Sequence, residues 1–106
     1  MRDGLYRVEF QTPLGAGAGI VVVNGSKLRG GDSSMYYVGS YSETGNQFTA
    51  EVVSHRHTLG FPSVFARDAN HITLKGTSQG DRAEMTGTSK EEPGVTLRGT
   101  MTKIDE

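Results

Sequence analysis

Apolar and polar residues alternate along most of this chain, which is the pattern of strands that have one buried face. Within residues 5–12, Tyr6, Val8 and Phe10 fall on one face, and charged or amide residues fall on the other. Residues 48–57 repeat the alternation and form the longest predicted strand. The chain therefore predicts strands throughout, and helical periodicity is hard to find.

The last third of the chain carries the most regular alternation. Residues 72–77, 83–88 and 95–100 alternate apolar with polar positions, and each segment has Gly-Thr near its end. The positions predicted to face inward are Ile72, Leu74, Gly76, Ala83, Met85, Gly87, Val95, Leu97, Gly99 and Met101. Glycines at one place on successive inner faces are typical of strands that bend to close a barrel.

Turn signals separate the strands. Asn24-Gly25 predicts a hairpin with a type I′ turn, because both central residues of that turn need positive φ. Residues 30–34 are predicted to interrupt the strand ladder. Residues 59–68 are ambiguous, and Pro62 favours a short helical turn over residues 63–66.

This organisation predicts an all-β fold, a small antiparallel up-and-down β-barrel of about eight strands, as one domain over residues 1–106. A flattened sandwich of two sheets is the alternative. Hydrophobic residues make up only 34% of the chain and 15 of its 106 residues are glycine. A barrel accounts for both values, because only its inner face needs to be apolar.

Charge and composition exclude several function classes. The formal net charge of -1 argues against a protein that binds nucleic acid through a basic face. The absence of cysteine excludes a disulfide scaffold, a zinc finger and a thiol nucleophile. No apolar run approaches the length of a membrane span, and no secretory signal is visible at the start. We therefore expect a cytoplasmic protein without membrane contact.

Few side chains suggest chemistry. His55 and His57 would point to one side of a strand, but a metal site needs a third ligand and none is evident. Arg56 is expected inside the barrel or near its rim, where it either extends its charged group to the rim or pairs with an acid such as Asp32. No acid–base pair, nucleophile or cofactor motif has a defined spacing. The residues therefore predict a binding or interaction module without cofactor or metal, and an enzyme with Arg56 and both histidines at the rim is a weaker alternative.

Two further features have open interpretations. The glycine-rich run at residues 15–19 lacks the Gly-Lys-Ser/Thr ending of a phosphate loop, so it is either a flexible hairpin arm or a strand that another backbone approaches closely. Tyr36, Tyr37 and Tyr41 form either a binding patch or ordinary cross-strand packing.

A series of motifs over residues 3–65 resembles one protein family. They are Asp3-Gly4-Leu5-Tyr6 with Phe10, Gly17-Ala18-Gly19-Ile20, Asn24-Gly25, Gly30-Gly31-Asp32, Tyr37-Val38-Gly39, His55-Arg56 and Pro62-Ser63-Val64. In order and spacing they resemble the negative regulators of type III secretion, the global regulator of LEE repressor family. The resemblance implies a lipocalin-like barrel that forms homodimers. It also implies a cytoplasmic regulator that binds and blocks a transcriptional activator without contacting DNA.

One departure from the family concerns the partner. The founding regulator contacts its activator through an acidic run in the turn before the long strand. Here that turn is Glu43, Thr44, Gly45 and Asn46, which is the partner-binding surface that the resemblance implies, but it holds a single acid. The departure favours a changed protein partner on a retained scaffold.

Two functions follow as hypotheses. The first is a non-enzymatic regulator that binds a protein partner. The alternative is a carrier of a small apolar ligand, which needs an interior pocket of roughly 300 Å³ or more. Its predicted lining is Tyr6, Val8, Phe10, Phe48, Val52, Arg56, Leu74, Met85 and Leu97.

Overall fold

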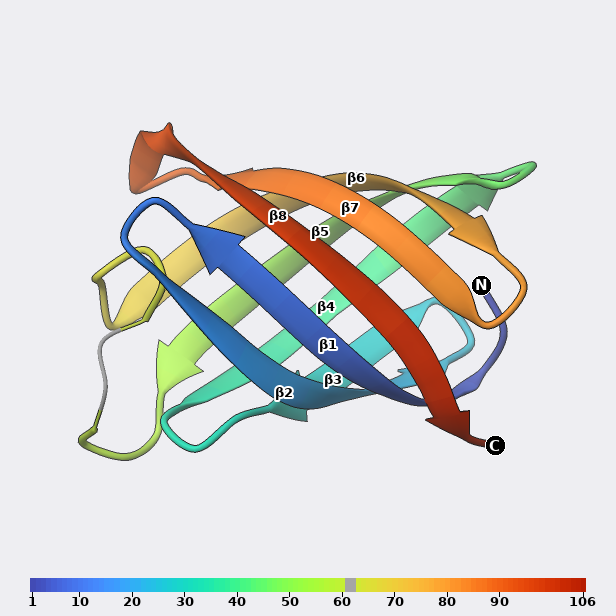
Figure 1. Cartoon of the computed structure of the whole chain (residues 1–106), viewed down its shortest axis with the longest axis horizontal. Coiled ribbons are helices and arrows are strands. Elements are labelled where there is room, and N and C mark those ends of the chain that lie inside the picture. Colours follow the sequence, from blue (N-terminus) through green and yellow to red (C-terminus); the bar gives the residue numbers. More distant parts are fainter. Residues whose placement is uncertain (61–62) are drawn as a thin grey trace.

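The computed structural model describes residues 1–60 and 63–106 and forms a closed antiparallel barrel of eight strands (Figure 1). The strands are β1 (Gly4–Thr12), β2 (Gly15–Asn24), β3 (Lys27–Gly31), β4 (Met35–Thr44), β5 (Gln47–Arg56), β6 (Ala69–Gln79), β7 (Arg82–Ser89) and β8 (Glu92–Asp105). Each strand pairs with the next along the chain, and β8 pairs back to β1. The predicted barrel is confirmed and the sandwich was wrong.

No helix long and apolar enough to cross a membrane occurs among the described residues.

The inner faces match the alternation in the sequence. The side chains predicted to point inward on β1 and on β6 to β8 are buried or half-buried, as are those of Phe48 and Val52 on β5. The core therefore consists of one continuous inner surface. The outer face is mostly polar, which explains why the share of hydrophobic residues in the chain is low.

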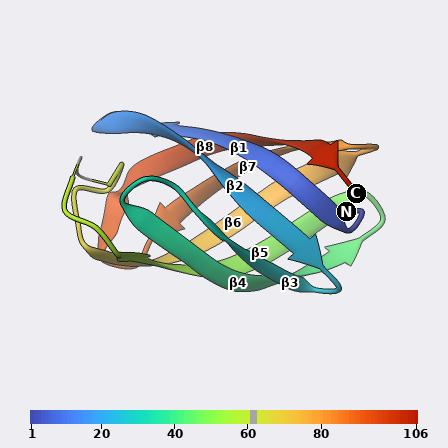
Figure 2. The same ribbon diagram turned by 90° about the horizontal axis from the view of Figure 1, so that it is seen from below.

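Both termini lie at one end of the barrel, which we call the closed end (Figure 2). The three two-residue turns at this end begin with Gly25, Gly45 and Gly80, which have φ values of 64°, 63° and 63°. In the first of them, Asn24 pairs with Lys27, so the central residues are Gly25 and Ser26. The predicted hairpin is confirmed, but a positive φ at its first central position alone is the pattern of a type II′ turn.

The inward glycines make room for large side chains across the sheet. A Cβ atom on Gly76 would lie 2.7 Å from the ring of Phe48, and one on Gly87 would lie 2.6 Å from Leu74. On Gly99 it would lie 2.9 Å from the Met85 side chain. These glycines thus pair small with large residues on neighbouring strands, which lets a narrow barrel hold its core.

The glycine-rich run belongs to β2, and two nearby expectations change. Gly17 lies against the Phe10 ring, and Gly19 lies against the Gly31 carbonyl. The run is therefore a strand that others approach closely, as one of its two interpretations proposed. Gly30 and Gly31 were expected to interrupt the ladder, but they extend β3 and pair with both neighbouring strands. Only glycine allows the backbones to approach this closely.

The closed end is covered by the N-terminal segment. The Tyr6 hydroxyl donates a hydrogen bond to the Arg2 carbonyl (2.7 Å), and the Tyr41 hydroxyl donates one to the Met1 carbonyl (3.1 Å). The Met1 ammonium donates to the Glu43 carboxylate, which also accepts from the Ser78 hydroxyl at 2.6 Å. Tyr41 thus packs within the barrel, whereas Tyr36 lies outside and stacks on His55 with ring centroids 5.6 Å apart.

The opposite end carries the longest connection, between β5 and β6. Its described part ends in a single turn, in which the Ala66 N–H donates to the Ser63 carbonyl at 2.8 Å. The Ser63 hydroxyl donates to the Arg67 carbonyl at 2.8 Å. The turn expected over residues 63–66 is this single hydrogen-bonded turn, and no helix continues from it, because Ala66 has a positive φ of 57° that leaves the helical path. Pro62 lies outside the described residues.

Candidate ligand-binding cavity

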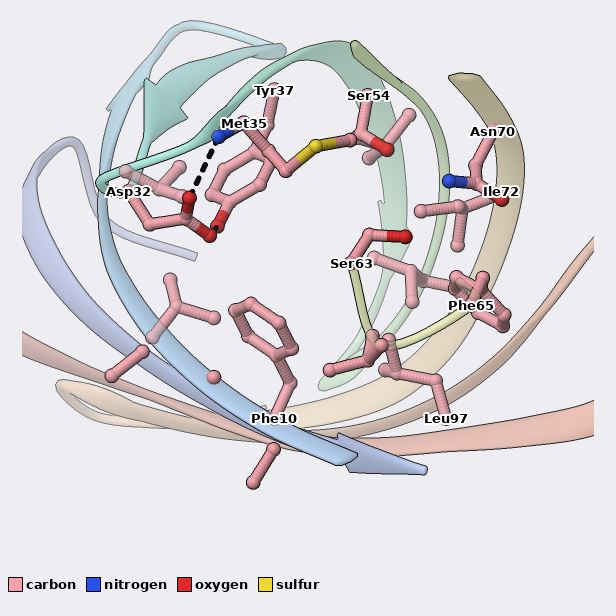
Figure 3. A pocket seen from close by; sticks show the side chains of 18 of the residues that line it. Phe10, Asp32, Met35, Tyr37, Ser54, Ser63, Phe65, Asn70, Ile72 and Leu97 are labelled. Atoms are coloured by element: carbon pink, nitrogen blue, oxygen red, sulfur yellow. Dashed lines mark hydrogen bonds between the residues drawn. The ribbon is translucent and has the colours of Figure 1, made fainter. Parts of the chain in front are cut away.

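The barrel contains a cavity of about 300 Å³, whose lining Figure 3 shows. The lining includes Asp32 and Ser33, between β3 and β4, so the cavity reaches toward the end opposite the termini. Its floor is apolar and includes Leu74, Met85 and Met101. Polar side chains gather nearer its mouth: Asp32, Ser33, Ser34, Tyr37, Ser54, Ser63 and Asn70. This is the arrangement of a small-molecule site, in which a few polar groups orient a ligand that is held mostly by apolar contact.

Most of the predicted lining residues meet at this cavity. They are Val8, Phe10, Val52, Leu74, Met85 and Leu97. Tyr6 and Phe48 lie elsewhere in the core, and the Tyr6 hydroxyl is bound to the covering segment. The alternation identifies which residues point inward, but it does not tell how far along the axis an inward side chain meets empty space.

Arg56 does not line the cavity. Its Nε donates to the Asp68 carboxylate at 2.6 Å, and its side chain is largely buried beside the loop between β5 and β6. An acidic partner at the rim was expected, but Asp68 takes this position and Asp32 does not. Residue 56 is the last of β5, so its side chain meets the loop that follows and not the barrel interior.

Residues 64 and 65, in the described part of the loop between β5 and β6, insert into the mouth of the barrel. Phe65 is 1% exposed and Val64 is 8% exposed, and both line the cavity. The Thr12 hydroxyl donates to the Val64 carbonyl at 2.6 Å, which ties the loop to the end of β1. Sequence reasoning missed this lid, because an irregular loop gives no periodicity that would place its side chains inside a barrel.

Asp32 and Tyr37 form the main polar pair at the mouth. The Tyr37 hydroxyl donates to the Asp32 carboxylate, which also accepts from the N–H groups of Ser34 (2.9 Å) and Met35 (2.8 Å). The Tyr37 ring meets the Phe10 ring edge-on, with centroids 6.1 Å apart. The turn between β3 and β4 therefore holds a carboxylate in a defined position at the cavity.

The environment keeps Asp32 charged. Burial raises the pKa of this carboxyl, but the hydrogen bonds from Tyr37, Ser34 and Met35 favour the charged form and set the pKa below its usual range. Burial and the neighbouring carboxylate raise the pKa of the Tyr37 hydroxyl, so it remains a donor. At neutral pH the mouth thus carries one negative charge on Asp32.

His57 and His71 make separate sets of contacts. His57 contacts the Thr58 hydroxyl (2.6 Å) and the Asp32 carbonyl (2.9 Å) through its ring nitrogens, and His71 contacts the Glu91 carboxylate (2.7 Å). Among residues 1–60 and 63–106, no group of three or more acidic or histidine side chains could hold a metal ion.

The turn over residues 43–46, which the family resemblance implies as the partner-binding surface, contains one acidic side chain, and that side chain is already paired. The Glu43 carboxylate is paired with the Met1 ammonium and the Ser78 hydroxyl, and this pairing lowers the pKa of Glu43. The Asn46 carbonyl accepts from the Ser78 N–H at 2.7 Å. The turn over residues 43–46 therefore offers a partner no unpaired carboxylate.

Comparison with known proteins assigns this chain to no family. No model of a known protein family matches the chain, and no curated protein matches its sequence.

Proposed function

We propose that this protein is a non-enzymatic binding protein whose barrel takes up a small, mostly apolar molecule. The observation that carries the proposal is the cavity of about 300 Å³ in the barrel interior. That volume is at the lower end for small-molecule pockets. At roughly 30 Å³ for each non-hydrogen atom, taken from the volume of a water molecule in the liquid, it holds about ten such atoms.

The test is the binding of octanol, which has a suitable size, measured by isothermal titration calorimetry. Val52 lines the cavity, and its neighbour Val53 lies on the outer face of β5. We expect one octanol per barrel, and we expect Val52→Phe to weaken binding by about tenfold or more because the added ring fills the cavity. Val53→Phe is the matched control and should bind as the original chain does. Equal binding by both variants would place octanol outside the barrel.

A second function is favoured by an apolar patch on the outside of the barrel. Ile20 and Val22 on β2 and Tyr36 and Val38 on β4 are each 40–45% exposed. The register places Arg29 of β3 between Val22 and Val38, so the four apolar side chains flank one short strand. Exposed apolar residues clustered in this way indicate a protein contact.

We propose that a second copy of this chain covers the β4 side of the patch, Tyr36 and Val38. Lys27 lies on one side of β4, opposite Ser40, and Glu51 lies on the other side of the same residue. A two-fold axis parallel to β4 would therefore place Lys27 of each copy over Glu51 of the other. The same axis places Tyr36 and Val38 of the two copies over one another, between the opposite charges, and this arrangement suits a symmetric dimer.

Substitution of Val38 tests the dimer. Val38→Lys should convert a dimer into a monomer in sedimentation experiments at high micromolar concentration, because a charge would be buried without a partner. Thr86→Lys is the control, since Thr86 is exposed on β7, away from the patch. A monomeric original chain at that concentration would contradict the proposal.

The resemblance to secretion regulators extends this proposal to gene regulation. The protein would then act in the cytoplasm by blocking a transcriptional activator. Because Glu43 is already paired, that contact is assigned to the exposed patch on β2 and β4, where the activator would compete with the second copy.

A further inference from the structure

Asp32 gives the cavity a charge that no cationic side chain of its lining balances, and His57, which lies outside the lining, has the smallest of the effects that lower the pKa of this carboxyl. It is the one charged residue among the described residues that line the cavity, and the remaining lining side chains are apolar, hydroxyl or amide groups. In the described part of the chain, its carboxylate takes part in no ion pair. The site is therefore complementary to a positive charge and repels a negative one.

The carboxylate also retains the capacity to bind. An ionised carboxylate has about four acceptor positions, and the three hydrogen bonds from Ser34, Met35 and Tyr37 leave about one of them open. His57 faces the backbone carbonyl of Asp32 with its Nε2 atom, and Arg56 is engaged with Asp68. In Figure 3 the carboxylate lies beside the Tyr37 ring at the edge of the cavity.

We propose that the cavity selects a small amphiphile with a cationic head, such as a primary alkylammonium ion. The ammonium group binds the open acceptor position of Asp32, and an apolar tail lies on the floor formed by Leu74, Met85 and Met101. This inference rests on the proposed ligand-binding function. A charge-assisted hydrogen bond at a partly desolvated site is stronger than a neutral one, so charge at the head decides the selectivity.

Three probes with the same tail test the selectivity: octylamine, octanol and octanoic acid, titrated into the protein at neutral pH. We expect octylamine to bind about tenfold or more tightly than octanol, as a hydrogen bond to a charged group implies. Octanoic acid should bind most weakly of the three, since its carboxylate meets the charge of Asp32.

Asp32→Asn isolates the charge. The amide oxygen can still accept from the Ser34 and Met35 N–H groups, so the turn keeps its main hydrogen bonds. In this variant octylamine should bind no more tightly than octanol, and octanol should weaken less than octylamine, because its neutral hydroxyl loses less than an ammonium ion does. Asp81→Asn is the control, because it removes the same charge in the turn between β6 and β7, at the closed end. It should leave all three affinities unchanged.

The outcomes separate this inference from the proposed function. If octanol binds as tightly as octylamine, or if Asp32→Asn weakens neither ligand, the cationic selectivity is overturned while the binding function stands. If octanoic acid binds most tightly, the selectivity is likewise overturned. If none of the three binds, the binding function fails as well. Should Asp32→Asn not fold, the order of the three affinities in the original chain still decides.

Discussion

Gly30→Ala should be the most damaging small substitution in this barrel. A Cβ atom at this position would lie 1.9 Å from the Ile20 carbonyl oxygen and 2.8 Å from the Val21 Cα atom. Both contacts are with backbone, so no side chain can rotate away. The clash can be relieved only by separating β2 from β3, which pair over just five positions.

We expect a loss of about 3 kcal/mol or more in the free energy of unfolding, at the upper end for an overpacked site. For a chain of this size, that corresponds to a fall in Tm of roughly 12 °C or more. Thermal unfolding followed by circular dichroism measures it.

Gly94→Ala is the matched control for Gly30→Ala. Gly94 is also a strand glycine, in β8, but it is exposed and a Cβ there meets no atom within 4 Å. This variant should be neutral or slightly more stable, because alanine reduces the conformational entropy of the unfolded chain. An equal loss in both variants would contradict the close approach of β2 and β3 at Gly30.

Phe65→Ala should destabilise the protein about as strongly, although Phe65 lies in a loop. Its ring is 1% exposed and packs with the core of the barrel. Replacing a buried phenylalanine with alanine costs about 3–5 kcal/mol, so Tm should fall by roughly 15 °C. The enlarged cavity should also accept a longer alcohol such as decanol, which calorimetry would detect.

Leu59→Ala provides the control within the same loop. Leu59 is 92% exposed, so its truncation should change the free energy of unfolding by less than about 0.5 kcal/mol. If Phe65→Ala behaved like Leu59→Ala, the loop would not be seated in the barrel mouth. The comparison therefore tests the lid itself, separately from any ligand.

The alternation of inward and outward side chains along each strand explains why the sequence identified the core but not the lid, Val64 and Phe65. Alternation has a period of two, so residues such as Val8, Val52 and Leu97 can be assigned to the inner face from local order alone. Phe65 follows no such period. Its burial depends on a contact between Thr12 and Val64, 52 residues apart in the chain.

Arg56 shows the same limit at the end of a strand. Alternation predicts that it points inward, together with Ser54, and Ser54 is indeed buried in the cavity lining. The strand ends at Arg56, and the side chain turns toward Asp68 in the following loop. Strand periodicity says nothing about the partners that a loop supplies beyond the last paired residue.

The sequence by itself determined the all-β class, the closed barrel, the inward residues of its strands and the positions of most turns. These follow from periodicity and from glycine, whose effects are local. Only the tertiary structure decided that a cavity remains, that Phe65 and Val64 close its mouth, that Asp32 carries its charge and that Glu43 is paired with Met1. Empty volume and charge pairing depend on residues brought together from distant strands, which no local pattern records.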